Sequence, residues 1–239
     1  MKAIEIKGLK KSFKGVYAVN GIDIEVEEGQ LFALLGENGA GKTTTVKMLC
    51  GLTKKTEGEI KIFGLDAETE REKINAILNL SPQETAVANN LSVKENLEFI
   101  SSLYGAGKEE AKNKAQTIIE ELGLTEVKDR KAKKLSGGMQ RRLSIAMAII
   151  TEPKLLFLDE PTLGLDVRAR RELWSLIRAL KGKTTVVLTT HYMEEAESLA
   201  DYVAVMEKGL IKERGTVKEL LDKTGTAKLE DAFMKIVEA

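Results

Sequence analysis

Apolar and polar residues alternate along the start of the chain in a way that predicts β-strands. An uninterrupted apolar run, residues 31–35, predicts a buried strand. A turn that contains Phe13, Gly15 and Tyr17 separates the first two alternating segments. We therefore expect an antiparallel β layer at the N-terminus, beside the buried strand. The alternating segments are residues 4–7, 22–27 and 59–64.

The pattern changes to a helical period near residue 92. Ser92 and Glu95 form a capping-box pattern, which is typical of a helix start. Gly123 and Pro153 are expected to end helices. The predicted helices are residues 96–104, 108–122 and 137–151. Residues 83–152 are therefore expected to form a helical lobe inserted into an α/β core.

Strands and helices alternate again after this lobe. Such alternation favours a parallel sheet with right-handed crossovers, whose ligands lie beyond the carboxyl ends of the strands. The predicted strands are residues 154–158, 184–190 and 202–206, and the predicted helices are 167–180 and 193–200. We expect one domain spanning 1–239, in which 1–82 and 153–215 form the core with its β layer and 216–239 form a helical tail.

Composition and charge argue against several classes of protein. Lys and Arg together number 37, as do Asp and Glu, so bulk charge gives no sign of a nucleic-acid partner. The single cysteine, Cys50, rules out an internal disulfide and agrees with a reducing cytoplasm. No apolar run approaches the ~18 residues of a membrane helix, and the first residues lack the apolar core of a signal peptide. We expect a cytoplasmic protein that works at the membrane's cytoplasmic face by docking on another protein.

A phosphate-binding loop of the form G-x-x-x-x-G-K-[ST] follows the buried strand. Residues 44–50 can form the helix after it, with Gly51 as its stop. Glycines let main-chain N–H groups approach a phosphate, and the helix N-terminus adds a favourable dipole. Lys42 is placed to bind the β- and γ-phosphates, and the Thr43 hydroxyl to bind Mg²⁺. The predicted nucleotide-binding residues here are Gly36, Glu37, Asn38, Gly39, Ala40, Gly41, Lys42, Thr43 and Thr44.

Two carboxylates follow the apolar run at residues 155–158. Asp159, at the strand end, is suited to hold Mg²⁺ directly or through water. Glu160 can turn towards the γ-phosphate and take a proton from the attacking water. A strand followed by a polar turn would use the same residues, so it is the phosphate loop that favours the catalytic interpretation.

A third segment, Leu135-Ser136-Gly137-Gly138, stands just before the acidic strand. With the phosphate loop it makes the chain resemble the ATP-binding cassette family, whose signature is Leu-Ser-Gly-Gly. The sequence departs from the family at Leu163, where a small or polar residue is usual, and at Phe13, where Tyr is commoner. Other segments match the family in its own order along essentially the whole chain: Phe13, Gln83, Gly164-Leu165-Asp166 and His191.

The resemblance implies roles that the residues alone leave open. Ser136 would grip the γ-phosphate of an ATP held by a second copy, although it is equally suited to be a helix N-cap. His191 would hold the γ-phosphate, Gln83 would sense that phosphate and Mg²⁺, and Phe13 would stack on adenine. Without the family, these would be a packed histidine, a surface glutamine and a core aromatic. By resemblance the catalytic set is Lys42, Glu160 and His191, the metal set is Thr43, Gln83 and Asp159, and the further nucleotide-binding residues are Phe13, Gln83, Ser136, Gly137, Gly138 and Asp166.

The implied fold is α/β: a P-loop NTPase core with a mostly parallel sheet, an N-terminal antiparallel β layer and an inserted helical lobe. The implied function is an ATP-binding and ATP-hydrolysing subunit, with ATP and Mg²⁺ as cofactors, that powers a membrane transporter. The implied partners are a second ABC subunit, expected to be a second copy in a head-to-tail dimer, and a separate transmembrane permease. No nucleic acid is expected. Residues 167–174 and 229–233 resemble exporters of the drug-resistance, ABC-2 type.

Two other functions compete with transport. A cassette ATPase acting on DNA or ribosomes is disfavoured, because the lobe is short, lacks sustained heptads and belongs to a chain without excess positive charge. A regulatory subunit without turnover is disfavoured by the presence of both Glu160 and His191. The basic run at 128–134 is expected to be a solvated face, with a position near anionic lipid as the alternative.

Overall fold

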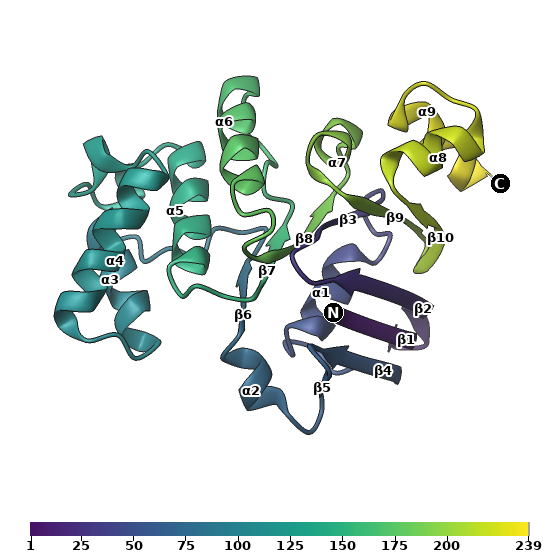
Figure 1. The fold of residues 1–239 in the computed structure, drawn as a ribbon, viewed down its shortest axis with the longest axis horizontal. Helices are drawn as coiled ribbons and strands as arrows, with labels where there is room; N and C mark the ends of the chain where they lie inside the picture. Colours follow the sequence, from purple (N-terminus) through teal and green to yellow (C-terminus); the bar gives the residue numbers. More distant parts are fainter. Residues whose placement is uncertain (239) are drawn as a thin grey trace.

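A six-stranded sheet runs through the centre of the molecule (Figure 1). The computed structural model describes residues 1–238; Ala239, the last residue of the predicted tail, lies outside the described residues. The strand order is β10-β9-β3-β8-β7-β6, with β10 antiparallel to β9 and the other neighbours parallel. The strands are β3 (Leu31–Leu35), β6 (Leu78–Ser81), β7 (Leu155–Asp159), β8 (Thr185–Thr190), β9 (Tyr202–Glu207) and β10 (Leu210–Gly215). This sheet confirms the predicted α/β core.

A second, antiparallel sheet lies beside the core and confirms the predicted N-terminal β layer. Its order is β2-β1-β4-β5, formed by β1 (Lys2–Phe13), β2 (Val16–Glu27), β4 (Glu57–Ile62) and β5 (Leu65–Asp66). The first two strands are much longer than expected, so Phe13 ends β1 and Tyr17 lies in β2 rather than in a turn. The β1–β2 register shifts at several points, including between Ile6 and Leu9. These irregularities break the apolar–polar alternation, so the pattern marks only part of each strand.

Alternate residues of the central strands enter two different hydrophobic clusters. Phe32 and Leu34 of β3 join a cluster shared with the antiparallel sheet and with α1 (Lys42–Leu49). Leu31, Ala33 and Leu35 face the other way. There they pack in a cluster with helices α6 (Val167–Arg178), α7 (Met193–Leu199), α8 (Val217–Thr224) and α9 (Leu229–Glu238). The central sheet is therefore covered on both faces, which explains the wholly apolar run of β3.

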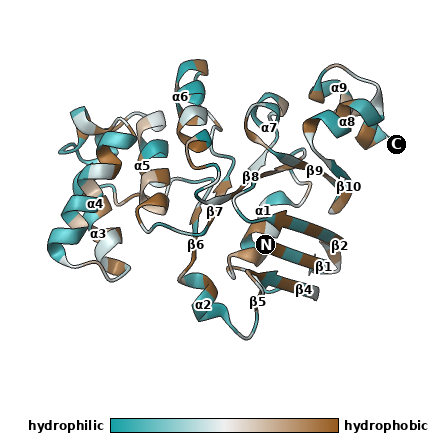
Figure 2. Ribbon diagram, viewed as in Figure 1, coloured by the Kyte–Doolittle hydropathy of each residue, from teal (hydrophilic) through white to brown (hydrophobic). Residues whose placement is uncertain are grey.

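The helical lobe has a hydrophobic cluster of its own. It is built from α3 (Val93–Leu103), α4 (Lys108–Glu121), α5 (Gly137–Ile149) and two short 3₁₀ turns, Thr125–Val127 and Ala132–Lys134. Figure 1 shows these helices at one end of the central sheet, and Figure 2 shows α4 mostly in hydrophilic colours. Ser92 and Glu95 form the predicted capping box at the start of α3. The lobe follows β6, whose carboxyl end leads directly to Gln83.

Four helices or strands were not predicted: α2 (Arg71–Asn75), β5, β6 and β10. The first three have two to five residues, and β10 has one buried position, Gly215, so periodicity gives little signal. The predicted tail does form helices, yet α9 is part of the core rather than an external layer, since Phe233 is 1% exposed. Across residues 1–238, the structure contains no helix with the length and apolarity needed to cross a membrane.

Candidate functional site

The phosphate loop joins the carboxyl end of β3 to the start of α1 and is held tightly against its neighbours. A Cβ atom at Gly36 would lie 2.2 Å from the Met206 carbonyl oxygen, and one at Gly41 would lie 2.4 Å from that of Ala18. Gly41 also has a φ of 111° at the N-cap of α1. Both positions therefore require glycine, because a side chain would displace main-chain atoms.

The Lys42 ammonium folds back over this loop. Its Nζ donates hydrogen bonds to the carbonyl oxygens of Gly36 at 2.8 Å and Glu37 at 3.0 Å. It also lies 3.5 Å from Glu160 Oε1. Burial lowers the pKa of Lys42, and the carboxylates of Glu160 and Asp159 oppose that shift. A buried ammonium at the N-terminus of a helix marks this loop as an anion-binding site.

The acidic strand β7 brings its last carboxylate to the first turn of α1. Thr43 Oγ1 donates a hydrogen bond to Asp159 Oδ1 at 3.1 Å. Thr189, in the neighbouring strand β8, donates from its hydroxyl to the same carboxylate oxygen at 2.5 Å. The structure thus brings together two of the three predicted Mg²⁺ ligands, Thr43 and Asp159. Sequence reasoning missed Thr189, which is one of several threonines in an otherwise apolar strand.

Glu160 is held in an uncommon main-chain conformation. Its φ is 47°, in the left-handed region that non-glycine residues seldom adopt. Its N–H donates to both the carbonyl and the hydroxyl oxygen of Thr189, at 3.1 and 3.0 Å. This geometry places the carboxylate between two other predicted catalytic groups, since Oε1 lies 3.5 Å from Lys42 Nζ and Oε2 lies 3.3 Å from His191 Nδ1. His191 Nδ1 is buried and has no hydrogen-bond partner within residues 1–238.

A cavity of about 590 Å³ opens over these groups. It collects residues that lie far apart in the sequence and come from the β layer, the phosphate loop, the lobe entry and the ends of β7 and β8. Its volume suits a ligand of nucleotide size. Its lining residues are Phe13, Ala18, Asn38, Gly39, Gly41, Lys42, Thr43, Thr44, Gln83, Glu160, Leu163 and His191.

Phe13 and Gln83 stand at the edges of this cavity. The Phe13 ring is 51% exposed, and the Lys11 ammonium lies 4.7 Å from its centroid on one face. The ring is thus a surface residue, which argues against the core alternative. Gln83 is also exposed, and its carbonyl oxygen accepts a hydrogen bond from Arg141 Nη1 at 3.1 Å.

The signature residues lie outside the cavity. Ser136 caps α5, where its Oγ accepts a hydrogen bond from the Met139 N–H at 3.3 Å. Asp166 caps α6 in the same way, accepting from the Ala169 N–H at 2.8 Å. Within one chain these two residues therefore act as helix caps. Ser136 and Gly137 are exposed to solvent.

Sequence reasoning also missed Arg141, a residue of α5 that is 4% exposed. Its side chain donates to main-chain carbonyls on both sides of the site, including those of Asp159 and Glu160. Burial lowers its pKa, and the nearby carboxylates of Asp159, Glu195 and Glu160 oppose the shift. In the sequence, Arg141 and Arg142 stand close to the basic run at 128–134, which is expected to be a solvated face. The apolar residues that follow in α5 are the one signal that this helix is buried.

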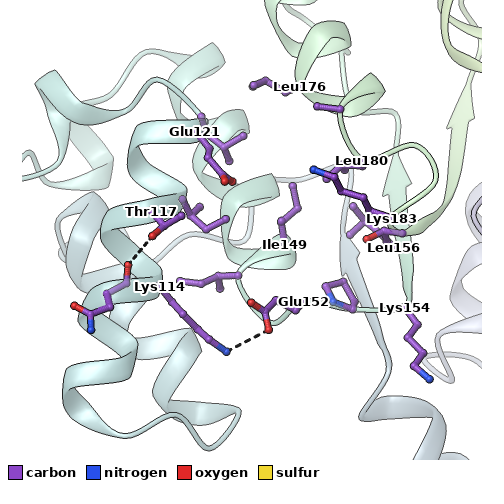
Figure 3. A pocket seen from close by; sticks show the side chains of 17 residues that line it. Lys114, Thr117, Glu121, Ile149, Glu152, Lys154, Leu156, Leu176, Leu180 and Lys183 are labelled. Carbon is purple, nitrogen blue, oxygen red and sulfur yellow. Dashed lines mark hydrogen bonds and ion pairs between the residues drawn. The ribbon is translucent and has the colours of Figure 1, made fainter.

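A second cavity, of about 840 Å³, lies at the opposite ends of the strands (Figure 3). It is lined by residues of α4, of the end of α5 and of the end of α6, and by Leu156 of β7. Figure 3 shows an ion pair between Lys114 and Glu152 on the side of the cavity that belongs to the lobe. Lys114 Nζ lies 3.4 Å from Glu152 Oε2. This cavity is remote from the phosphate loop and has no part in the site described above.

The donor set of the nucleotide cavity suits a metal ion that arrives with its phosphates. Within residues 1–238, no group of three or more His, Cys, Asp or Glu side chains is placed to hold a metal ion. Thr43 lines the cavity, and its hydroxyl donates a hydrogen bond to the carboxylate of Asp159 beside it. Mg²⁺ is usually held by one or two protein oxygens together with substrate phosphates, so these residues fit it.

Comparison with known proteins identifies the family. The ABC transporter family profile matches residues 19–163. The daunorubicin/doxorubicin resistance ATP-binding protein DrrA of Streptomyces peucetius is 42% identical over 226 residues, which cover 94% of this chain and 68% of that protein. The human phospholipid-transporting ATPase ABCA3 is 40% identical over 226 residues, which cover 93% of this chain and 13% of that protein.

Solved structures give the same result. The structure of an ATP-binding subunit of an ABC transporter superposes with a TM-score of 0.88 at 27% identity, covering 98% of this chain and 99% of that one. A dimeric structure of a bacterial ABC transporter cassette gives a TM-score of 0.82 at 25% identity, covering 90% and 98%. The phosphate loop, acidic strand and signature helix described above lie in the part of the chain that the profile matches. The chain therefore belongs to the ABC transporter family, in which it is an ATP-binding and ATP-hydrolysing cassette.

Proposed function

We propose that the chain is the energy-supplying subunit of a membrane exporter and hydrolyses Mg-ATP in the cavity above the phosphate loop. The observation that carries this proposal is the convergence of Lys42, Glu160, Gln83 and His191 on one cavity of about 590 Å³. Charge neutralisation and positioning supply most of the catalysis of phosphoryl transfer, and this cavity offers groups for both.

Thr43, Asp159 and Gln83 are the residues that would hold Mg²⁺. The ion would supply positive charge against the phosphate oxygens. Lys42 and the N–H groups at the start of α1 would bind the same phosphates from the protein side. Thr189 would keep the Asp159 carboxylate in place through its hydroxyl, since it donates to Oδ1.

Glu160 is the proposed general base. Its buried carboxylate lies between Lys42 and His191 and can accept a proton from a water molecule facing the γ-phosphate. His191 is proposed to hold the geometry of that phosphate, because it lines the cavity while its buried Nδ1 lies 3.3 Å from Glu160 Oε2. Phe13 is proposed to stack on the adenine through the ring face that Lys11 does not cover.

The exposed signature segment supports a composite site in a head-to-tail dimer of two copies. Ser136, Gly137 and Gly138 lie at the N-terminus of α5, which has thirteen residues, and do not reach the cavity of their own chain. Backbone N–H groups at a helix start favour a phosphate, so a second chain can supply the anion. Asp166 is proposed to position the loop between the two sites from its place at the start of α6.

The proposed partner is a separate transmembrane permease, which docks on the helical lobe formed by residues 83–152 and keeps the cassette at the cytoplasmic face of the membrane. Export is proposed because relatives carry the names of a daunorubicin/doxorubicin resistance protein and of phospholipid-transporting ATPases. Action on DNA or ribosomes gains no support from these relatives.

The test of catalysis compares three proteins: wild type, Glu160→Gln and Lys42→Ala. Phosphate release from Mg-ATP and equilibrium binding of Mg-ADP are measured for each. We expect Glu160→Gln to bind Mg-ADP like wild type and to lose turnover by about 10²–10⁴-fold. We expect Lys42→Ala to lose affinity. Turnover of Glu160→Gln at the wild-type rate would refute the assignment of the base.

The test of export uses the chain purified with the membrane protein that it retains in mild detergent. That complex is placed in vesicles with the cassette facing outward, and doxorubicin fluorescence reports accumulation. We expect accumulation that requires Mg-ATP and is absent with Glu160→Gln. Retention of ribosomes or duplex DNA instead of a membrane protein would contradict the proposal.

A further inference from the structure

The Arg141 side chain joins the two segments that carry Gln83 and Glu160. It reaches across from α5 to main-chain oxygens on the loop after β6 and on the loop after β7. Its five contacts are Nε to Pro161 O at 2.8 Å, Nη1 to Pro82 O and to Gln83 O at 3.1 Å, and Nη2 to Asp159 O at 2.6 Å and to Glu160 O at 2.9 Å.

This contact set uses the whole guanidinium. An arginine has five N–H donors in a rigid planar fork, and here each donor can be assigned to one carbonyl oxygen. The side chain is 4% exposed. A buried charge that is satisfied by carbonyl groups rather than carboxylates fixes the course of the main chain instead of neutralising an acid.

The main chain that Arg141 holds includes Glu160, the proposed base, and so determines the direction of its carboxylate. Glu160 has a φ of 47°, which is uncommon for a residue with a side chain. The Glu160 N–H donates a hydrogen bond to the Thr189 hydroxyl oxygen, and the Glu160 carbonyl oxygen accepts one from Arg141 Nη2. Holding a residue in such a conformation requires surrounding contacts that over-determine it.

The same side chain sits on the signature helix. Ser136 caps the N-terminus of α5, and Arg141 projects from the second turn of that helix. A movement of α5 therefore acts directly on the loops that carry Gln83 and Glu160 in the same chain.

We infer that Arg141 is a positioning residue for ATP hydrolysis. It acts by holding the loops that carry Glu160 and Gln83 in a fixed position relative to the signature helix, α5. This inference rests on the proposed roles of Glu160 and Gln83. It predicts that loss of the guanidinium misplaces the base while leaving the phosphate loop, and hence nucleotide affinity, intact.

The experiment compares Arg141→Lys and Arg141→Met with Arg142→Met. Lysine offers three donors to the five carbonyls, and methionine offers none. Arg142 is the matched control, because it is adjacent on α5 and pairs with Glu172 of α6 instead of reaching the site. For each protein, kcat and KM for Mg-ATP, the dissociation constant for Mg-ADP and the thermal midpoint are measured.

We expect kcat to fall by about 10²-fold in Arg141→Met and by less in Arg141→Lys, with the Mg-ADP dissociation constant within about twofold of wild type. Arg142→Met should keep the wild-type kcat. The stoichiometry of Mg-ADP binding reports the folded fraction, so a loss of folded protein is separated from a loss of turnover. If Arg141→Met does not fold, Arg141→Lys decides. Wild-type kcat in the folded Arg141 variants, or a loss of affinity that accounts for the lower rate, would overturn the inference.

A double-variant cycle tests whether Arg141 acts through Glu160. In single-turnover assays, Arg141→Lys should lower the rate of wild type much more than it lowers the residual rate of Glu160→Gln. Equal effects in both backgrounds would show that Arg141 does not act through the base. If Glu160→Gln itself keeps wild-type turnover, the proposed function of Glu160 fails; if it is inactive while Arg141→Lys is fully active, the role of Arg141 alone fails.

Discussion

At the scale of single residues, Gly41 is determined by two independent constraints. Its φ is 111°, and a Cβ atom would lie 2.4 Å from the Ala18 carbonyl oxygen. We expect Gly41→Ala to lower the free energy of unfolding by about 1–3 kcal/mol and to weaken Mg-ADP binding at least about tenfold, because the loop must move. Calorimetric titration and urea unfolding measure the two effects.

The control for this substitution is Gly107→Ala. Gly107 is an N-cap with a φ of −65°, and an added Cβ meets nothing within 4 Å. It should leave Mg-ADP binding unchanged and lower the free energy of unfolding by no more than about 1 kcal/mol, because alanine is a poorer N-cap than glycine. Equal losses of Mg-ADP affinity in both variants would show that the close approach at Gly41 is not what the loop requires.

Cys50 illustrates how burial suppresses reactivity. Burial raises the pKa of its thiol from 9.0 to about 12. The thiolate is the reactive form, so near neutral pH its population should be about 10³-fold lower than for an ordinary cysteine. We expect iodoacetamide to label native protein slower by a similar factor than protein unfolded in urea, as followed by mass spectrometry. Equal labelling rates would contradict the burial of this thiol.

The residues of the site differ in how far sequence reveals them. The phosphate loop is contiguous, so its spacing alone predicts Lys42 and Thr43. Glu160 follows from its place after a buried strand. Arg141 does not, because its five partners are main-chain oxygens from two other segments, and only the folded chain brings those oxygens together. Contacts to carbonyl groups leave no trace in the identity of the partner residues.

At the scale of elements, α7 packs against α6 through a buried carboxylate. Glu195 is fully buried, and its Oε1 accepts a hydrogen bond from Trp174 Nε1 at 3.1 Å. Burial raises the pKa of Glu195, and the hydroxyls of Thr190 and Thr162 oppose the shift. The folded state therefore holds this proton more tightly than the unfolded state does. Its contribution to stability is present below the ordinary pKa of 4.5 and is lost as the pH rises through the raised folded-state value.

Glu195→Gln removes this titration. We expect the variant to be more stable than wild type at about pH 8, by about 1.4 kcal/mol for each unit of the shift, with the difference shrinking as the pH falls. Urea unfolding across that range measures it. Glu194→Gln, an exposed neighbour, should show no such trend. A difference that stays constant with pH would contradict the raised pKa.

The C-terminal helix α9 belongs to the core. Phe233 is 1% exposed in a cluster that includes strands of the central sheet. We expect Phe233→Ala to lower the free energy of unfolding by about 3–5 kcal/mol. Met234→Ala should have little effect, since that side chain is 46% exposed. Urea unfolding of both variants tests this; equal small losses would show that the tail is not part of the cooperative unit.

Element boundaries follow the strength of periodicity. The wholly apolar β3 and the capped α3 were predicted because burial and capping leave local patterns. Strand β6 reads Leu-Asn-Leu-Ser, and β10 reads Leu-Ile-Lys-Glu-Arg-Gly. Both are edge strands of the central sheet, so each has one neighbour and less burial to impose a pattern. Tertiary pairing, rather than local sequence, makes them strands.

At the scale of the whole molecule, the exposed signature segment lies next to the loop after β7, since Leu165 Cδ2 is 3.7 Å from the position of a Cβ atom added at Gly138. Ser136 and Gly137 are exposed, and they are accompanied by two large apolar side chains, Leu163 at 40% and Met139 at 37% exposure. Leu163 also lines the cavity. In a single chain, the N-terminus of α5 and these apolar side chains remain exposed to solvent. A second copy is therefore proposed to cover them.

Leu163 therefore offers a test of the dimer that leaves the phosphate loop in place. In the Glu160→Gln background, Mg-ATP should convert monomer to dimer, as measured by light scattering. We expect Leu163→Asp to weaken this dimer at least about tenfold, because the interface between the two copies would then bury an unpaired carboxylate. Leu103→Asp, at a 68% exposed position on α3, is the matched control and should dimerise like its parent. Measurements at saturating Mg-ATP, with nucleotide occupancy checked in each variant, separate a broken interface from a lost ligand. A Leu163→Asp variant that binds nucleotide and still dimerises fully would show that the copies do not meet at this loop.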